Sequence, residues 1–216
     1  MSNLFDGCSS ITNLAISNFD TSKVTNFTYM LSGTKMKTLD LTNFNTKNVL
    51  DMSFFLFKCR SLTSADFSSF DTSKVTTMQN MFSDTYLNQL ILKNFNTKNV
   101  VTMNSMFASN WNLKSLDVSS FDTSKVTEMF RMFDSCSNIE ELDVTHFDTI
   151  EVLDMGSMFR ECYSLTSLDL RNFKTQNVKD MYEMFEGDDN LAYLDLTSFN
   201  TSKVRDILQC FQDVIY

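Results

Sequence analysis

The apolar residues of this chain recur with a fixed period. Phenylalanine followed by Asp, Asn or Lys and then by Thr occurs eight times, at spacings of 25 or 26 residues. We number a 26-position unit from this phenylalanine, which is Phe19, Phe44, Phe70, Phe95, Phe121, Phe147, Phe173 and Phe199. Position 3 is always Thr and position 6 is always Val, while Met dominates positions 9 and 12 and Phe dominates position 13. A period of this length predicts a solenoid of stacked units.

Each unit predicts two elements. Positions 19–24 place apolar residues at 22 and 24 around a polar residue at 23, which predicts a short half-buried strand. The apolar residues at positions 6, 9, 12 and 13 are spaced like one face of a short helix. Asp-Thr or Asn-Thr precedes this segment as an N-cap, and three of the four glycines share position 15, where a left-handed residue would end the helix. The alternative is a second short strand at positions 6–9.

The units predict an α/β solenoid. The register is never lost, so residues 1–216 form a single solenoid domain of about eight 25–26-residue units. The expected arrangement is a parallel sheet on one side and short helices on the other. Turns would be about 4.8 Å apart on the sheet side and about 10 Å apart on the helix side, so the sheet should be concave.

Two segments resemble a known family. The strings CYSLTSLDLRNFKT (residues 162–175) and FDTSKVTTMQNMF (residues 70–82) resemble the BspA-like leucine-rich-repeat family over essentially the whole chain. The resemblance implies a right-handed leucine-rich-repeat solenoid with a concave parallel sheet and convex helices. It also implies a cell-surface or secreted protein, such as a surface lipoprotein, whose adhesion depends on a protein ligand from a host or a neighbouring cell.

Composition excludes several functions. The net charge is −9 and the pI is near 4.5, which argues against nucleic acid as a partner. The longest purely apolar run, residues 54–57, is too short for direct membrane insertion. One histidine and five cysteines without a Cys-x-x-Cys pair offer no zinc site. No phosphate loop or nucleophile elbow is present, so we expect no enzyme, no catalytic residues, no metal and no cofactor.

Two sets of residues are candidates for partner binding. Position 23 forms an acidic column, interrupted at Ala15 and Ile91, that consists of Asp40, Asp66, Asp117, Asp143, Asp169 and Asp195. The column is open to three interpretations: carboxylates bonded to flanking Ser and Thr, a bridging cation such as Ca²⁺, or a docking site for a basic partner. Tyr86 and Trp111 at position 17 accompany the interruption at Ile91, and exposed aromatic residues often anchor interfaces. Their alternative role is ordinary packing at the rim.

The leading hypothesis is a non-catalytic protein-binding or adhesion module that binds on the concave sheet face. The alternatives are a structural spacer or self-associating segment of a longer array, and an intracellular inhibitor built on the same solenoid. The sequence begins within a unit, with Met1 at position 9, and it ends within a unit, with Val214 at position 16. Because solenoid ends need polar caps and neither end has one, we also expect end-to-end self-association.

Overall fold

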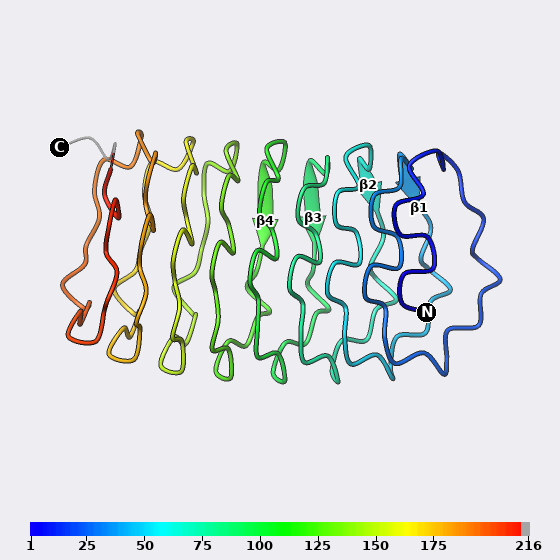
Figure 1. Cartoon of the computed structure of the whole chain (residues 1–216), viewed down its shortest axis with the longest axis horizontal. Helices are drawn as coiled ribbons and strands as arrows, with labels where there is room; N and C mark the ends of the chain where they lie inside the picture. The colour runs from blue at the N-terminus through cyan, green and yellow to red at the C-terminus, as the bar shows by residue number, and fades with distance from the viewer. Residues whose placement is uncertain (213–216) are drawn as a thin grey trace.

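The computed structural model describes residues 1–212, so Val214 lies outside the described part of the chain. Successive sequence units form turns that stand side by side in a row (Figure 1). One side of the row carries four short strands: β1 (Thr38–Leu39), β2 (Ser64–Ala65), β3 (Gln89–Ile91) and β4 (Ser115–Asp117). β1 pairs with β2 and β3 pairs with β4, both in parallel. The predicted strand is therefore confirmed in these four units, and we call this side the strand face.

The predicted helices are wrong for residues 1–212, where the structure contains no helix. The opposite side of each unit instead makes a single parallel bridge at position 8 to the next unit. These bridges link Asn26, Asp51, Thr77, Thr102, Glu128, Asp154, Asp180 and Asp206 without interruption. The alternative, a second short strand at positions 6–9, is not formed in the described residues either, because only position 8 of each unit is bridged. We call this side the ladder side.

Two tight turns replace each helix on the ladder side. The N–H groups at positions 9, 11, 13 and 15 donate to the next unit, as Phe107 does to the carbonyl of Met132 at 3.0 Å. Those at positions 12, 14 and 16 donate three residues back, as Met106 does to Met103 at 3.1 Å. Positions 11 and 15 have positive φ, for example 55° at Arg131 and 69° at Gly33. A type II turn requires this at its third residue, so the shared glycine position closes a turn.

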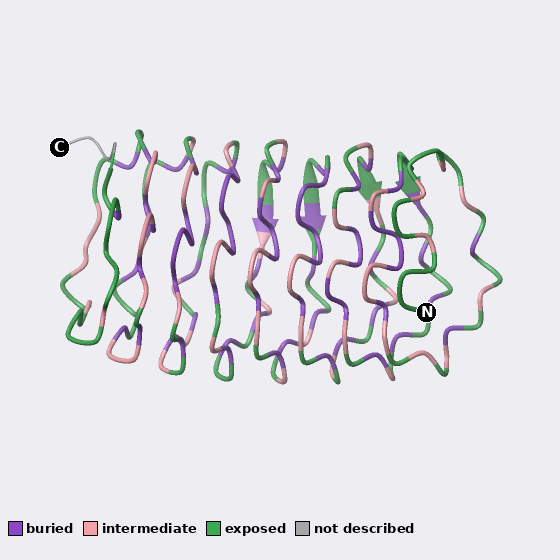
Figure 2. Ribbon diagram, viewed as in Figure 1, coloured by how far each residue is buried: buried purple, intermediate pink, exposed green. Residues whose placement is uncertain are grey.

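The core is a column of stacked side chains along the row. Phenylalanine rings at position 13 lie 5.7–5.9 Å apart with interplanar angles of 7–8° between neighbouring units. They are Phe82, Phe107, Phe133, Phe159 and Phe185, and all are fully buried. Buried residues recur at the same places in each turn (Figure 2). Since each ring packs on both neighbours, a unit completes its core only within the stack.

The invariant threonine at position 3 joins the backbones of neighbouring units. The Thr97 hydroxyl donates to the carbonyl of Asp122 at 2.9 Å and accepts the Asp122 N–H at 2.8 Å. Thr46 makes the same pair of bonds with Asp71. The hydroxyl thus replaces a direct backbone bond at a corner of the unit, which explains why Thr occupies this position throughout.

Lysine and asparagine alternate at position 5 from Lys23 to Lys125, and again at Asn177 and Lys203 after an interruption at Glu151. Each Asn amide donates to a backbone carbonyl of the preceding unit, as Asn99 does to Ser73 at 2.9 Å. The lysine of the next unit then donates to the free amide oxygen, and the distances are 2.9 Å for Lys74–Asn48 and 3.0 Å for Lys125–Asn99. The alternation keeps lysines of this column off adjacent turns, where like charges would repel.

The absence of helices also removes the reason to expect a concave sheet. Neither side of a unit carries a helix in the described residues, so neither side is widened by one. The turns accordingly stand in a simple row in Figure 1. Within residues 1–212 no helix of the length and apolarity needed to cross a membrane was found.

Candidate binding face

The aspartates of the position 23 column are held in one repeated geometry. In each, one carboxylate oxygen accepts the backbone N–H two residues later, at 2.8–3.1 Å. The residues are Asp40, Asp66, Asp117, Asp143, Asp169 and Asp195. This local bond is the Asx turn that short polar side chains favour at the end of an extended segment. Each carboxylate is therefore fixed in orientation before any partner arrives.

Hydrogen bonds keep this column ionised. The Ser119 hydroxyl and N–H lower the pKa of Asp117, and the Thr145 hydroxyl and N–H lower that of Asp143. The side chain and N–H of Arg171 lower the pKa of Asp169 to about 2. Because the folded pKa lies below the unfolded one, this stabilisation is present above about pH 4 and is lost as the pH falls through the folded value. At neutral pH the column is negatively charged.

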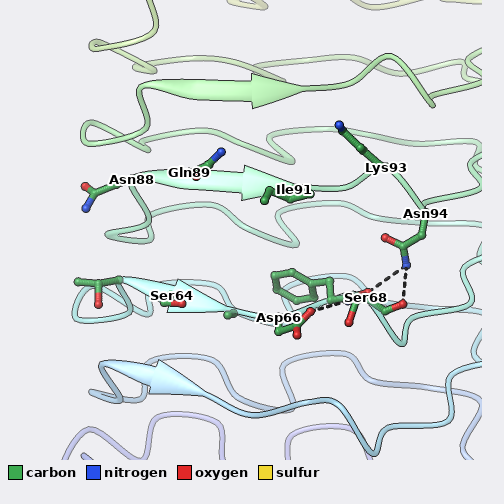
Figure 3. Close-up of a pocket in the computed structure, with 11 residues that line it drawn as sticks. Ser64, Asp66, Ser68, Asn88, Gln89, Ile91, Lys93 and Asn94 are labelled. Carbon is green, nitrogen blue, oxygen red and sulfur yellow. Dashed lines mark hydrogen bonds between the residues drawn. The ribbon is translucent and has the colours of Figure 1, made fainter.

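Grooves lie on the strand face, between neighbouring units that no strand pairing joins. The largest, of about 720 Å³, lies between β2 and β3. Its lining includes Asp66, Gln89, Ile91 and Lys93 (Figure 3). Asn94 reaches back across it and donates to the carbonyl of Phe67 at 3.0 Å. The groove is thus spanned by one side chain and otherwise open to solvent.

The other three grooves follow one another along the acidic column. They measure about 380, 350 and 290 Å³. The first is lined by Asp117 and Asp143, the second by Asp143 and Asp169, and the third by Asp169 and Asp195. The candidate aspartates from Asp117 onward therefore form a continuous series of shared groove walls.

The structure separates the predicted aromatic contact into two places. Ile91, with 59% of its surface exposed, lines the largest groove together with Asp66. Tyr86 and Trp111 are also exposed, at 48% and 43%, but neither lines that groove. Trp111 is therefore not buried under the opposite side of the unit, and its ring is accessible to a partner.

Sequence reasoning missed several residues of this face. Glu140 and Glu141 line the groove beside Asp143, and Tyr193, with 74% exposure, lines the groove between Asp169 and Asp195. All precede the column on the same segment. For Glu141 and Tyr193 the available signal was position 21, which points outward like position 23 and is Ser at Ser64, Ser115 and Ser167. Reading that second outward position would have found these two residues, whereas Glu140 lies at position 20 and carries no such signal.

Other polar groups have structural roles. The His146 ring nitrogen Nε2 lies 3.0 Å from the carbonyl of Val118. Burial raises the pKa of the Cys59 thiol to about 11 and also raises that of Cys136, which makes these thiols poor nucleophiles. Within residues 1–212 no group of three or more His, Cys, Asp or Glu side chains is placed to hold a metal ion.

These features define a stacked-repeat protein with a bonded ladder side and an open acidic face. Residues 1–86, 55–141 and 132–215 match the family described as "Mycoplasma protein of unknown function, DUF285". The matches extend over nearly the whole sequence, so the chain belongs to this family. The sequence resemblance predicted that the chain belongs to a known family of repeat proteins, and this match confirms that prediction. No curated protein matches the sequence significantly.

Solved structures with a similar course of the chain are leucine-rich proteins. A leucine-rich repeat protein from Bacteroides ovatus is 18% identical, with a TM-score of 0.40 over 88% of this chain and 56% of the other. One from Eubacterium ventriosum is 15% identical, with a TM-score of 0.39 over 87% and 60%. A leucine rich cell surface protein from Faecalibacterium prausnitzii is 14% identical, with a TM-score of 0.37 over 88% and 62%. The chain thus spans 56–62% of the length of these structures.

Proposed function

We propose that this chain is a non-catalytic protein-binding module of a cell-surface or secreted protein, and that its strand face takes a basic segment of the partner. The observation that carries the proposal is the row of ionised aspartates along the open grooves. Each carboxylate is already oriented by its Asx turn, so binding costs little further ordering. The ladder side, by contrast, uses its backbone groups to join units.

Charge supports a basic partner. The chain has a net charge of −9, and Glu140 and Glu141 add to the carboxylates of the face. The Arg171 guanidinium lies 2.6 Å from Asp169 and is paired within the face. An acidic surface of this kind steers a cationic partner toward it and fixes its register. Binding should therefore weaken as the salt concentration rises.

The test neutralises three aspartates while preserving the fold. In a variant combining Asp117→Asn, Asp143→Asn and Asp169→Asn, the amide oxygen still accepts the turn N–H, so only the charge changes. The matched control is Asp20→Asn, Asp71→Asn and Asp122→Asn, whose carboxylates make the same bonds to Ser22, Ser73 and Ser124 at another corner of the unit.

The probe is a synthetic extended peptide with lysine at alternate positions, compared with its glutamine counterpart by fluorescence anisotropy. We expect the first variant to bind the lysine peptide about tenfold more weakly than the control variant does. Equal weakening in both variants would mean that net charge alone attracts the peptide. Unchanged affinity in both would remove the acidic column from the binding site.

A contact at the interruption of the column is a second element of the proposal. Ile91 offers an exposed apolar surface within the largest groove, and Trp111 is exposed on the following unit. Trp111 is the single tryptophan, so its emission reports on this region alone. Addition of a verified partner should shift that emission, and Ile91→Ser should weaken the same partner. A partner that binds without either effect would place the contact elsewhere.

Self-association is the alternative function that a specific observation favours. Apolar residues are exposed at both ends of the described row, including Leu4 at 45% and Leu208 at 69%. A second copy could cover such surfaces by extending the stack. Light scattering over a wide concentration range distinguishes the two functions, since Leu208→Ser should lower the average mass only if the ends associate.

A further inference from the structure

Position 16 forms a buried polar column beneath the ladder side. Its fully buried members are Thr34, Cys59, Thr85, Asn110, Cys136, Cys162 and Asp188, and each has no more than 2% of its surface exposed. Buried polar groups need hydrogen-bond partners. The bonds made along this column therefore show what kind of side chain the position requires.

The position requires a hydrogen-bond donor in most units. The thiols of Cys136 and Cys162 donate to the carbonyls of Phe107 and Phe133, one unit back, both at 3.2 Å. Cys59 donates to the equivalent carbonyl of Leu31, also at 3.2 Å. Thr85 instead donates its hydroxyl to Asn110. No member of the column from Cys59 to Cys162 lacks a hydrogen to donate.

Asn110 shows how an amide fills this position. Its oxygen accepts the N–H of Thr85 at 3.2 Å, one unit back. Its nitrogen donates to the carbonyls of Phe82 and Phe107, at 2.9 and 2.7 Å. One atom of the side chain therefore accepts from the preceding unit, and the other must donate.

Asp188 occupies the same position but makes only the accepting hydrogen bond of this pattern. Its Oδ1 accepts the N–H of Cys162 at 2.9 Å, which matches the oxygen of Asn110. Its Oδ2 is buried and has no hydrogen-bond partner. By its place in the column, this oxygen corresponds to the donating nitrogen of Asn110, and the equivalent carbonyls belong to Phe159 and Phe185. A carboxylate there would face carbonyl oxygens with no hydrogen between them.

We propose that Asp188 is protonated in the folded chain, that its Oδ2 hydrogen completes the polar column, and that its ionisation at alkaline pH loosens the last described turns. The structure thus carries a pH-sensitive lock near one end of the array. The lock is independent of the proposed binding face, because Asp188 lies inside the unit.

The surroundings of Asp188 support a retained proton. Burial raises its pKa to about 8, the N–H of Cys162 lowers it, and the neighbouring Asp189 carboxylate raises it. The thiol of Cys162 has a pKa raised by burial and stays neutral. No cationic group contributes to the pKa of Asp188. The ionised form consequently lacks a counter-charge.

The sign of the pH dependence follows from linkage. Between about pH 4 and pH 8 the folded chain holds a proton that the unfolded chain has released, so rising pH favours unfolding. Above the folded pKa both states are ionised and the dependence ends. The Asp188→Asn variant keeps the donor and loses the titration.

The experiment measures urea unfolding of the wild type and of Asp188→Asn from pH 5 to pH 9. The ratio of their folding equilibrium constants should grow by about tenfold for each pH unit up to about pH 8 and then level off. Asn110→Asp should add a second dependence of the same sign in the middle of the chain. A constant ratio across this range would overturn the proposal.

A second measurement does not depend on any variant folding. In the ¹³C spectrum of the labelled wild type, the Asp188 carboxyl should titrate well above pH 6, after the exposed carboxyls have finished. The Cys162 amide should lose protection from hydrogen exchange over the same range. Titration of every carboxyl below pH 6 would contradict a protonated Asp188.

Discussion

The two long sides of the unit repeat with the same period but differ in how completely their backbones are joined. On the ladder side, bridges run from Asn26 to Asp206 without a break. On the strand face of residues 1–212, strand pairing is confined to β1–β2 and β3–β4. The two sides therefore differ in their roles. The ladder side holds the array together. The strand face leaves some junctions unpaired, and the grooves lie at those junctions.

Charge accounts for part of the difference. The longest pairing, β3–β4, sets Ile91 opposite Asp117, so no like charges meet. The β1–β2 pairing ends one residue before Asp40 and Asp66 would face each other. Successive aspartates face each other at the three acidic grooves, and like charges on neighbouring strands are unfavourable. Nothing in the charges explains the open junctions between Ala15 and Asp40 and between Asp66 and Ile91.

The comparison predicts that core truncation costs most on the ladder side. Phe133→Ala removes a fully buried ring stacked between Phe107 and Phe159, and should lower the free energy of unfolding by about 4 kcal/mol. Leu142→Ala, on the strand face of the same unit, should cost about 2 kcal/mol. Urea unfolding compares the two, and a larger cost at Leu142 would reverse the assignment of sides.

A smaller loss is expected when the corner hydroxyl is removed. Thr97→Val preserves shape but leaves the N–H and carbonyl of Asp122 without their bridging partner. The expected cost is about 2 kcal/mol, because both stranded groups are part-buried. Thr145→Val is the control, since that hydroxyl is exposed and bonds only Asp143, and it should cost less than about 0.5 kcal/mol. Similar losses at both sites would contradict the bridging role.

One substitution should convert a paired junction into an open one. Ile91→Asp places a carboxylate opposite Asp117, with Asp66 on the preceding unit. We expect a loss of about 0.5–1 kcal/mol and faster hydrogen exchange in β4. Ile91→Asn controls for the lost apolar surface. If both variants exchange equally fast, like-charge repulsion is not what opens the junctions.

Removal of divalent cations should have the smallest effect. The column carboxylates already accept backbone N–H groups, and residues 1–212 contain no cluster suited to a metal. Thermal unfolding midpoints in excess chelator and in added calcium should therefore agree. A midpoint several degrees higher in calcium would show that the cation binds the folded chain.

The sequence predicted the repeat, the apolar positions and the strand. The buried positions recur with the period of the fold and require apolar residues, so the period is visible in the residue types. It could not separate a helix from two consecutive turns, since both bring positions 9, 12 and 13 inward. The deciding feature was positive φ at position 11, which Phe54 and Arg131 adopt without any sequence mark. The aspartates were visible as a column, but the grooves depend on pairing between units, which no single unit encodes.

The alternation of lysine and asparagine at position 5 bears on how such an array can change in length. Lys74, Lys125 and Lys203 each bond the asparagine of the preceding turn. Duplication of a lysine unit alone, such as the one that begins at Phe70, would set two lysines on adjacent turns and leave one without its acceptor. Duplication of that unit together with the asparagine unit before it would repeat the bond. An array lengthened by such a pair would therefore keep this contact at every new turn.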